Sequence, residues 1–135
     1  MPSPRRSNIA GVSTDSRLQR GIASEDLAAD YLRARGLVVV ARNVRCRAGE
    51  LDLVCLDAGV LSIVEVRQRA RQDFGGALAS VTRRKQRKIV RAAEFFLQRQ
   101  SEWRRHAIRF DVLAVEGLPR GEHRVVWIKD AFRAA

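Results

Sequence analysis

The sequence has only two histidines and two cysteines and no long apolar run, and each shortage argues against a class of site. No run approaches the roughly 20 consecutive apolar residues that a membrane helix needs, so we expect no membrane partner. Cys46 and Cys55 form no CxxC pair, so we expect two packed or idle thiols and no disulfide. His106 and His123 stand in no HxxxH or HxH pattern, which argues against a zinc site.

Two sequence motifs are also missing. No GxxxxGK loop is present, so hydrolysis of nucleoside triphosphates has no support. Arg5 and Arg6 stand near the start, but the stretch that follows, residues 8–12, is too short and too mixed for the apolar part of an export signal. We therefore expect a cytoplasmic protein.

Acidic residues are scarce relative to basic ones. The formal net charge is +11 and the pI is about 11.3, which indicates a polyanionic partner, most simply nucleic acid. The charge is concentrated in residues 83–105, which hold nine basic side chains against Glu94 and Glu102. A face that merely solvates a helix usually mixes both signs, so we interpret this segment as a binding surface. Its nucleic-acid contacts are expected from Arg83, Arg84, Lys85, Arg87, Lys88 and Arg91.

The 135 residues suit one domain, which we place at residues 18–135, after a mobile basic tail of residues 1–17. Apolar spacing predicts a helix at 18–35 and a long basic helix from about residue 83. Residues 42–49 are expected to form a basic connection, and residues 68–80 a loop. Short apolar runs predict strands at 38–41, 49–54, 63–67, 109–115 and 124–128. This α-β-β-β-α-β-β order predicts an α/β fold with a central mixed sheet flanked by helices.

Two carboxylates stand on the second and third of these strands. Asp52 lies in GELDLV (49–54) and Glu65 in IVEVR (63–67), and a four-residue turn at 57–60 would place them directly opposite each other. Like charges so placed repel, so something must compensate. A shared proton, a flanking Arg or Lys, or a divalent cation such as Mg²⁺ could do so.

Glu25 and Arg67 are candidates to join this pair. Glu25 falls at the spacing of the apolar stripe of the first helix, which places a third carboxylate near the sheet. Arg67 follows Glu65 by two residues and so shares its face of the strand. A purely structural alternative is a surface ion pair between Arg67 and Glu50, which face each other in the same register.

These residue types suit hydrolysis of a phosphodiester. That reaction requires a positioned water and neutralisation of the charge that grows on the phosphoryl oxygens. Carboxylate-held Mg²⁺ or Mn²⁺ ions can supply both, with a fixed cation beside them. Asp52 and Glu65 would hold the metal, Glu25 would assist, and Arg67 would be the cation.

The chain resembles the YraN family of proposed endonucleases. The similarity runs from about Gly21 to Phe132, and its most specific blocks are GELDLV at 49–54 and RFDV at 109–112; WIKDAF at 127–132 is also similar. Weaker similarities are found at residues 21–25, 31–32, 42–43, 64–67, 74–75, 85–89 and 92–93.

The resemblance implies a restriction-endonuclease-like fold, similar to that of archaeal Holliday junction resolvases. It places Glu25, Asp52 and Glu65 at acidic metal-site positions and suggests branched DNA as substrate and a homodimer as assembly. Where the family usually carries lysine this chain has Arg67, which keeps its charge but cannot act as a general base. Lys85 or Lys88 could replace that lysine if the basic helix reaches the site. Asp111 matches a family position too, although an ion pair with Arg109 explains it equally well.

Three functions remain open from the sequence. The first is a metal-dependent endonuclease, a hydrolase acting on DNA. The second is a catalytically inactive nucleic-acid-binding module in which Arg67 and the basic helix bind phosphates. The third is an interaction protein whose basic face binds an acidic partner or a ribonucleoprotein.

Overall fold

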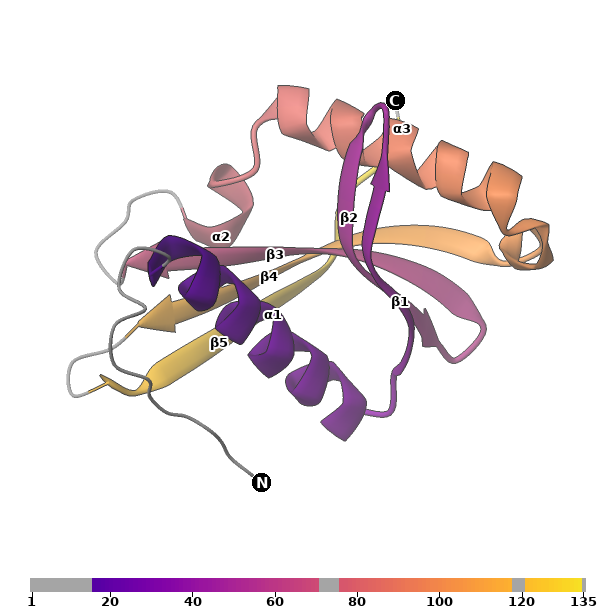
Figure 1. Cartoon of the computed structure of the whole chain (residues 1–135). Coiled ribbons are helices and arrows are strands. Elements are labelled where there is room, and N and C mark those ends of the chain that lie inside the picture. The colour runs from indigo at the N-terminus through magenta and orange to yellow at the C-terminus, as the bar shows by residue number, and fades with distance from the viewer. Residues whose placement is uncertain (1–15, 71–75, 118–120, 135) are drawn as a thin grey trace.

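A five-stranded mixed sheet with helices on both faces forms the centre of the molecule (Figure 1). The structure is a computed structural model, and it describes residues 16–70, 76–117 and 121–134. The strand order is β1-β2-β3-β4-β5; β3 and β4 are parallel and the other neighbours are antiparallel. This is the α/β architecture expected of a restriction-endonuclease-like fold.

The elements follow the expected order. The strands are β1 (Val38–Cys46), β2 (Gly49–Asp57), β3 (Val60–Ala70), β4 (Ala107–Gly117) and β5 (His123–Phe132). The helices are α1 (Ser16–Ala34), the short α2 (Gly76–Ala79) and α3 (Arg83–Arg99), followed by a 3-10 turn, η2 (Ser101–Trp103).

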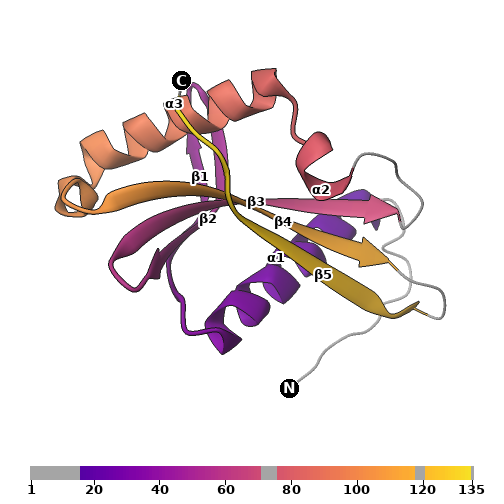
Figure 2. The ribbon, with the colours of Figure 1, turned by 180° about the vertical axis from the view of Figure 1, so that it is seen from behind.

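The two long helices cover opposite faces of the sheet, as both views show (Figures 1 and 2). Ala28, Ala29 and Leu32 of α1 pack in one core with residues of β2, β3 and β4. Ile89 and Phe96 of α3 belong to the other core, which also takes in Ala77 of α2. These residues belong to the predicted apolar stripes of the two helices, and their burial covers both apolar faces of the sheet.

The hairpin between β2 and β3 has the predicted register. Val54 pairs with Ile63 and Leu56 with Leu61, and the Asp57 and Val60 pair closes the turn. The two turn residues, Ala58 and Gly59, both have positive φ (49° and 90°). A two-residue turn of this kind matches the twist of the flanking strands, and glycine at its second position meets the backbone requirement at no steric cost.

Two predicted loops are partly wrong. The expected basic connection at 42–49 is mostly strand, because β1 continues to Cys46 and pairs along β2, for example Val44 with Leu51. Its charged side chains are compatible with an edge strand, where one face stays in contact with water. Within the expected loop at 68–80, β3 extends to Ala70 beside β4, and Gly76–Ala79 form α2.

Some predictions fall outside the described residues. These include most of the basic tail, the 74–75 similarity and the centre of the turn at 117–121. Among the residues that the structure does describe, no helix is both long enough and apolar enough to span a bilayer.

Candidate active site

The candidate site lies where β2 separates from β3. Their paired residues run from Asp57 and Val60 to Leu53 and Val64, and the ladder ends there. Beyond this point the first half of β2 pairs with β1 alone. The strand also twists here, because Leu51 packs in the core under α3 whereas Leu53 packs in the core under α1. Asp52 lies between these two leucines, at the fork.

Asp52 and Glu65 meet across the fork. Asp52 Oδ2 accepts a hydrogen bond from the backbone N–H of Val66 at 2.8 Å, and thereby occupies a ladder position that β2 has left. The side chains of Asp52 and Glu65 are hydrogen-bonded to each other, with Glu65 as the donor. Burial raises the pKa of both carboxyls, and the charge of Asp52 raises that of Glu65 further. The raised pKa values favour a shared proton, one of the three expected solutions.

Two cations flank the buried Glu65 and supply the second expected solution. Arg67 Nη1 lies 3.6 Å from Glu65 Oε2, and Lys85 Nζ of α3 lies 3.7 Å from the same oxygen. The alternative ion pair between Glu50 and Arg67 is not formed, because Glu50 pairs with Arg45 on β1 at 3.0 Å. The first turn of α3 thus reaches the site, as considered for Lys85 from the sequence.

The position of Lys85 follows from the way α3 begins. Thr82 caps the helix, with its Oγ1 accepting a hydrogen bond from the Lys85 backbone N–H at 3.1 Å. This cap fixes the first turn of the helix, from which the Lys85 side chain reaches Glu65. A Thr followed by a basic amphipathic stretch is the sequence signal for this start, but only the packed helix shows which lysine faces the carboxylates.

Glu25 of α1 approaches the same fork from the other face of the sheet. The pKa of Glu25 is raised by partial burial and next by the charge of Asp52, while Arg42 opposes the shift. Glu50 also raises this pKa, and the Asn43 side chain donates a hydrogen bond that lowers it. The structure therefore brings Glu25 close to Asp52, and it adds Glu50 and Asn43, which the sequence interpretation did not assign to the site.

The three carboxylates suit a hard divalent cation by type, since carboxylate oxygens are its preferred ligands. The pKa of each is raised first by burial and further by the charge of a neighbouring carboxylate. Within residues 16–70, 76–117 and 121–134, however, no group of three or more His, Cys, Asp or Glu side chains has the arrangement of a metal site. A metal held by Glu25, Asp52 and Glu65 therefore stays a prediction.

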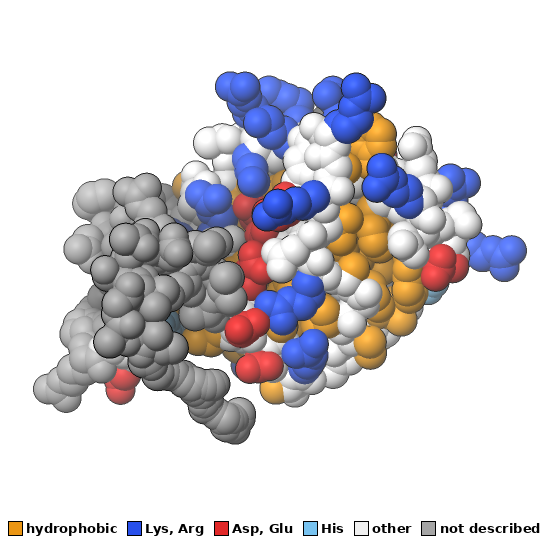
Figure 3. Space-filling model, viewed as in Figure 1, with side chains coloured by type: hydrophobic (Ala, Val, Ile, Leu, Met, Phe, Trp, Pro, Cys, Tyr) orange, Lys and Arg blue, Asp and Glu red, His pale blue; other side chains and the backbone are white. Residues whose placement is uncertain are grey.

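The basic residues of α3 divide between two flanks of the helix. Lys85 contacts Glu65, and Lys88 lies beside the β1–β2 turn, because a Cβ added to Gly49 would be 3.8 Å from the Lys88 Cβ. Arg83, Arg87 and Arg91 line a groove toward the end of β5. Arg84 is exposed. On the face shown in Figure 3, Lys and Arg side chains gather along the upper edge, over α3, above a short run of acidic ones.

Asp111 has a structural environment away from the fork. It is fully buried and accepts hydrogen bonds from Ser62 Oγ (2.7 Å), Trp127 Nε1 (3.1 Å) and the Asp130 backbone N–H (3.0 Å). Arg109 donates to both of its oxygens, at 2.8 and 2.9 Å, which confirms the expected ion pair. Both carboxylate oxygens of Asp111 accept hydrogen bonds from groups on β3, β4 and β5. These bonds account for a buried aspartate at this position without a role in the site.

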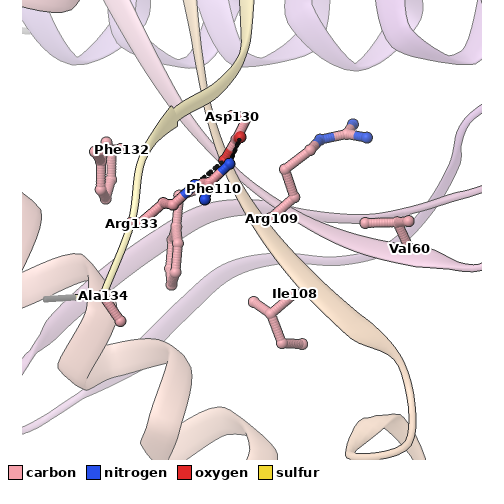
Figure 4. Close-up of a pocket in the computed structure, with 8 residues that line it drawn as sticks. All are labelled: Val60, Ile108, Arg109, Phe110, Asp130, Phe132, Arg133 and Ala134. Atoms are coloured by element: carbon pink, nitrogen blue, oxygen red, sulfur yellow. Dashed lines mark hydrogen bonds and ion pairs between the residues drawn. The ribbon is translucent and has the colours of Figure 1, made fainter.

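A cavity of about 480 Å³ lies near this network (Figure 4). It is lined by the first residues of β3 and β4, including Arg109, and by the chain from Asp130 to Ala134. None of the candidate site residues lines it. Arg109 is already paired with Asp57 and Asp111, and Arg133 with Asp130, so the charges at this cavity are largely neutralised within the chain.

The mixed sheet, its helices and a carboxylate pair at a strand fork define an α/β protein of restriction-endonuclease-like architecture. The chain belongs to the family described as "Uncharacterised protein family UPF0102", whose model matches residues 24–115. This is the YraN family, so the resemblance seen in the sequence is confirmed.

Relatives from pseudomonads share nearly the whole length of the chain. A UPF0102 protein of Pseudomonas putida strain F1 is 47% identical over 117 residues, which cover 87% of this chain and 95% of the relative. One from Ectopseudomonas mendocina strain ymp is 50% identical over 114 residues, 84% of this chain and 94% of the relative.

Proposed function

We propose that this protein is a metal-dependent endonuclease that hydrolyses phosphodiester bonds in DNA. The observation that carries the proposal is the fork between β2 and β3, where the buried Glu65 and the half-buried Asp52, both with raised pKa, lie beside two cations. A stable core would not need this arrangement, because burying carboxylates costs free energy. Clusters of perturbed titratable groups are typical of catalytic sites.

Each residue has a distinct part in the proposed reaction. Asp52 and Glu65 would hold Mg²⁺ or Mn²⁺, with Glu25 assisting from α1. The ion would supply a nucleophilic water and neutralise phosphoryl charge. Arg67 would brace a phosphoryl oxygen through its guanidinium group. Lys85 provides the ammonium group that the family usually places at position 67, and its half-exposed side chain can turn toward bound DNA. The exposed basic residues of α3 would bind neighbouring phosphates.

A specific observation also favours a second function, an inactive nucleic-acid-binding module. The Asp52 and Glu65 side chains are hydrogen-bonded to each other, and Arg67 and Lys85 flank Glu65, so the compensating groups all come from within the chain. Such a site can exist without metal. In that case the basic surface would still bind DNA, and no bond would be cleaved.

Cleavage by wild-type protein and an Asp52→Ala variant separates the two functions. Labelled single-stranded, duplex, flap and four-way-junction DNA are incubated with each protein in Mn²⁺, and binding is measured in parallel with EDTA. Purifying both proteins identically excludes a contaminating nuclease. We expect the wild type to cut at least one substrate, and the variant to bind equally well while cutting at least about 100-fold more slowly, a difference of about 2.7 kcal/mol in barrier height.

Equal binding without cleavage by either protein would contradict the endonuclease and establish the inactive module. Equal cleavage by both would show that the activity does not use this fork. If the wild type bound none of the four DNAs, both proposals would fail, and the acidic-partner function would replace them.

A further inference from the structure

A second basic surface lies across α3 from the candidate site. It is a groove of about 600 Å³ between α3 and the end of the chain after β5. Figures 1 and 2 show this last segment rising toward α3. Arg83, Arg87 and Arg91 line one wall at successive helical turns, and Arg133 lines the other.

The charge of the groove is unbalanced. Four arginines line it against one acidic residue, Glu94. Arg133 is paired with Asp130, but Arg83, Arg87 and Arg91 form no ion pair with any residue that the structure describes. Exposed arginines spaced one turn apart, about 6 Å along the helix axis, form a row of positive charge. A linear polyanion complements such a row.

The walls of the groove are apolar as well as basic. Leu78 of α2 is 40% exposed, although large aliphatic side chains in the described part of this chain are mostly buried. Val90, Ala131 and Phe132 line the same groove. The outside of a duplex presents phosphates and sugars, so it leaves apolar walls without a partner. A single strand also exposes the faces of its bases, which favour apolar surfaces.

We propose that the groove binds a single-stranded segment of nucleic acid, with its phosphates on Arg83, Arg87 and Arg91 and its bases against Leu78 and Val90. The proposal deepens the proposed function, and it rests on that function only for nucleic acid as the ligand. Lys85 and Lys88 lie on the opposite flank of α3, beside the fork and the β1–β2 turn. The helix therefore separates a single-strand groove from the proposed cleavage site.

Binding in EDTA tests this without any cleavage. Fluorescence anisotropy compares a labelled oligothymidylate with a blunt duplex, using the full chain and the double variant Arg87→Gln/Arg91→Gln. The matched control is Arg99→Gln/Arg105→Gln, which removes the same charge from exposed arginines outside the groove. Leu78→Gln, a change of no charge, is the third variant. Thermal unfolding checks that all variants are folded.

We expect the groove pair to weaken oligothymidylate binding about tenfold and to lower its salt slope by about 1.4, or 0.7 for each lost contact. Leu78→Gln should weaken oligothymidylate binding at least threefold, and the control pair should have much less effect. Duplex affinity should fall less than oligothymidylate affinity in both groove variants. Equal losses in the groove pair and the control pair would overturn the proposal, as would an unchanged affinity of Leu78→Gln.

Polyglutamate serves as the competing ligand. If it bound the wild type as tightly as the oligonucleotide and lost affinity in the groove pair, the groove would be a site for an acidic peptide, and the proposal would be wrong. Single-strand binding through the groove by a protein that never cuts DNA would uphold this proposal and contradict the endonuclease. Cleavage of DNA by a protein whose oligothymidylate binding is not selectively weakened by the groove variants would uphold the endonuclease and contradict the single-strand groove.

Discussion

At the scale of single residues, the protonation of Glu65 is the most informative feature. Its carboxyl is only 4% exposed and faces Asp52, and these two causes raise its pKa to about 8. A proton held on Glu65 at neutral pH would take the place of a compensating cation. Arg67 and Lys85 lie within 4 Å and oppose the shift without cancelling it. The site is thus arranged so that gaining positive charge, from a proton or a metal, is favourable.

This arrangement predicts how the stability of the metal-free protein depends on pH. Between its ordinary pKa of about 4.5 and about 8, Glu65 keeps a proton in the folded state that the unfolded chain has released. The folded state binds more protons in that window, so the free energy of unfolding falls as pH rises, by at most about 1.4 kcal/mol per unit. Urea unfolding at pH 5 to 8 measures this.

Glu65→Gln should flatten this profile, since the amide keeps the hydrogen bond but does not ionise. Glu94→Gln, on the exposed side of α3, is the control and should leave the slope unchanged. Added Mn²⁺ should raise the melting temperature of the wild type at pH 8, and that of Glu65→Gln much less. A profile that is equally steep in Glu65→Gln would mean that another group titrates.

At the scale of elements, the sheet is held together by polar residues that differ from those of the site. Asp111 joins β3 through Ser62, β4 through Arg109, and β5 through Trp127 and the Asp130 backbone. On the other half of β4, Glu116 pairs with Arg69 of β3 and Arg124 of β5. Asp52, by contrast, accepts one backbone hydrogen bond, from Val66 of β3, at the end of a ladder, so it links only β2 and β3.

Asp111→Ala should therefore destabilise the protein far more than Asp52→Ala does. Removing the Asp111 carboxylate leaves buried donors without an acceptor, and breaking a buried ion pair in this way costs about 3 to 5 kcal/mol. Urea unfolding at pH 7 gives the comparison, with Asp52→Ala as the matched loss of one carboxylate. Equal stability of the two variants would show that Asp111 is not the structural residue that its hydrogen bonds indicate.

At the scale of the whole molecule, an excess of positive charge surrounds a site made of carboxylates. The net charge of +11 attracts polyanions from a distance, and α3 presents basic side chains on the side of the fork and on the side of the groove. If the protein binds nucleic acid as proposed, long-range attraction would bring it to this surface, and local geometry would then select which strand occupies each flank. Contacts with phosphate confer affinity without sequence preference.

The flank beside the fork should bind duplex DNA through phosphates alone. Arg84 precedes Lys88 by one helical turn and therefore shares its flank of α3. Arg84→Gln and Lys88→Gln should each lower the salt slope of duplex binding by about 0.9 and weaken binding equally on unrelated sequences. Anisotropy titrations between 50 and 200 mM salt, with Arg105→Gln as control, measure the slopes. A slope that both substitutions leave unchanged would remove this flank from the DNA-binding surface.

Several features followed from local sequence. Apolar spacing predicted α1 and α3, and the positions of Asp57 to Val60 gave the register of the β2–β3 hairpin, because strand alternation depends only on the turn between the strands. That register led to the pairing of Asp52 with Glu65. The YraN resemblance was carried by short motifs in the chain, and the family match confirms it.

Other features were decided only by the tertiary structure. The strand character of 42–46 arises from pairing with β2, which no local propensity encodes. Arg67 pairs with Glu65 and not with Glu50, the partner considered from the sequence. The reason is that β2 leaves β3 at the fork and Arg45 pairs with Glu50. The approach of Lys85 to Glu65 and the division of α3 into two flanks depend on how the helix packs across the sheet. Packing sets these distances between residues far apart in the chain, so periodicity and motif spacing could not predict them.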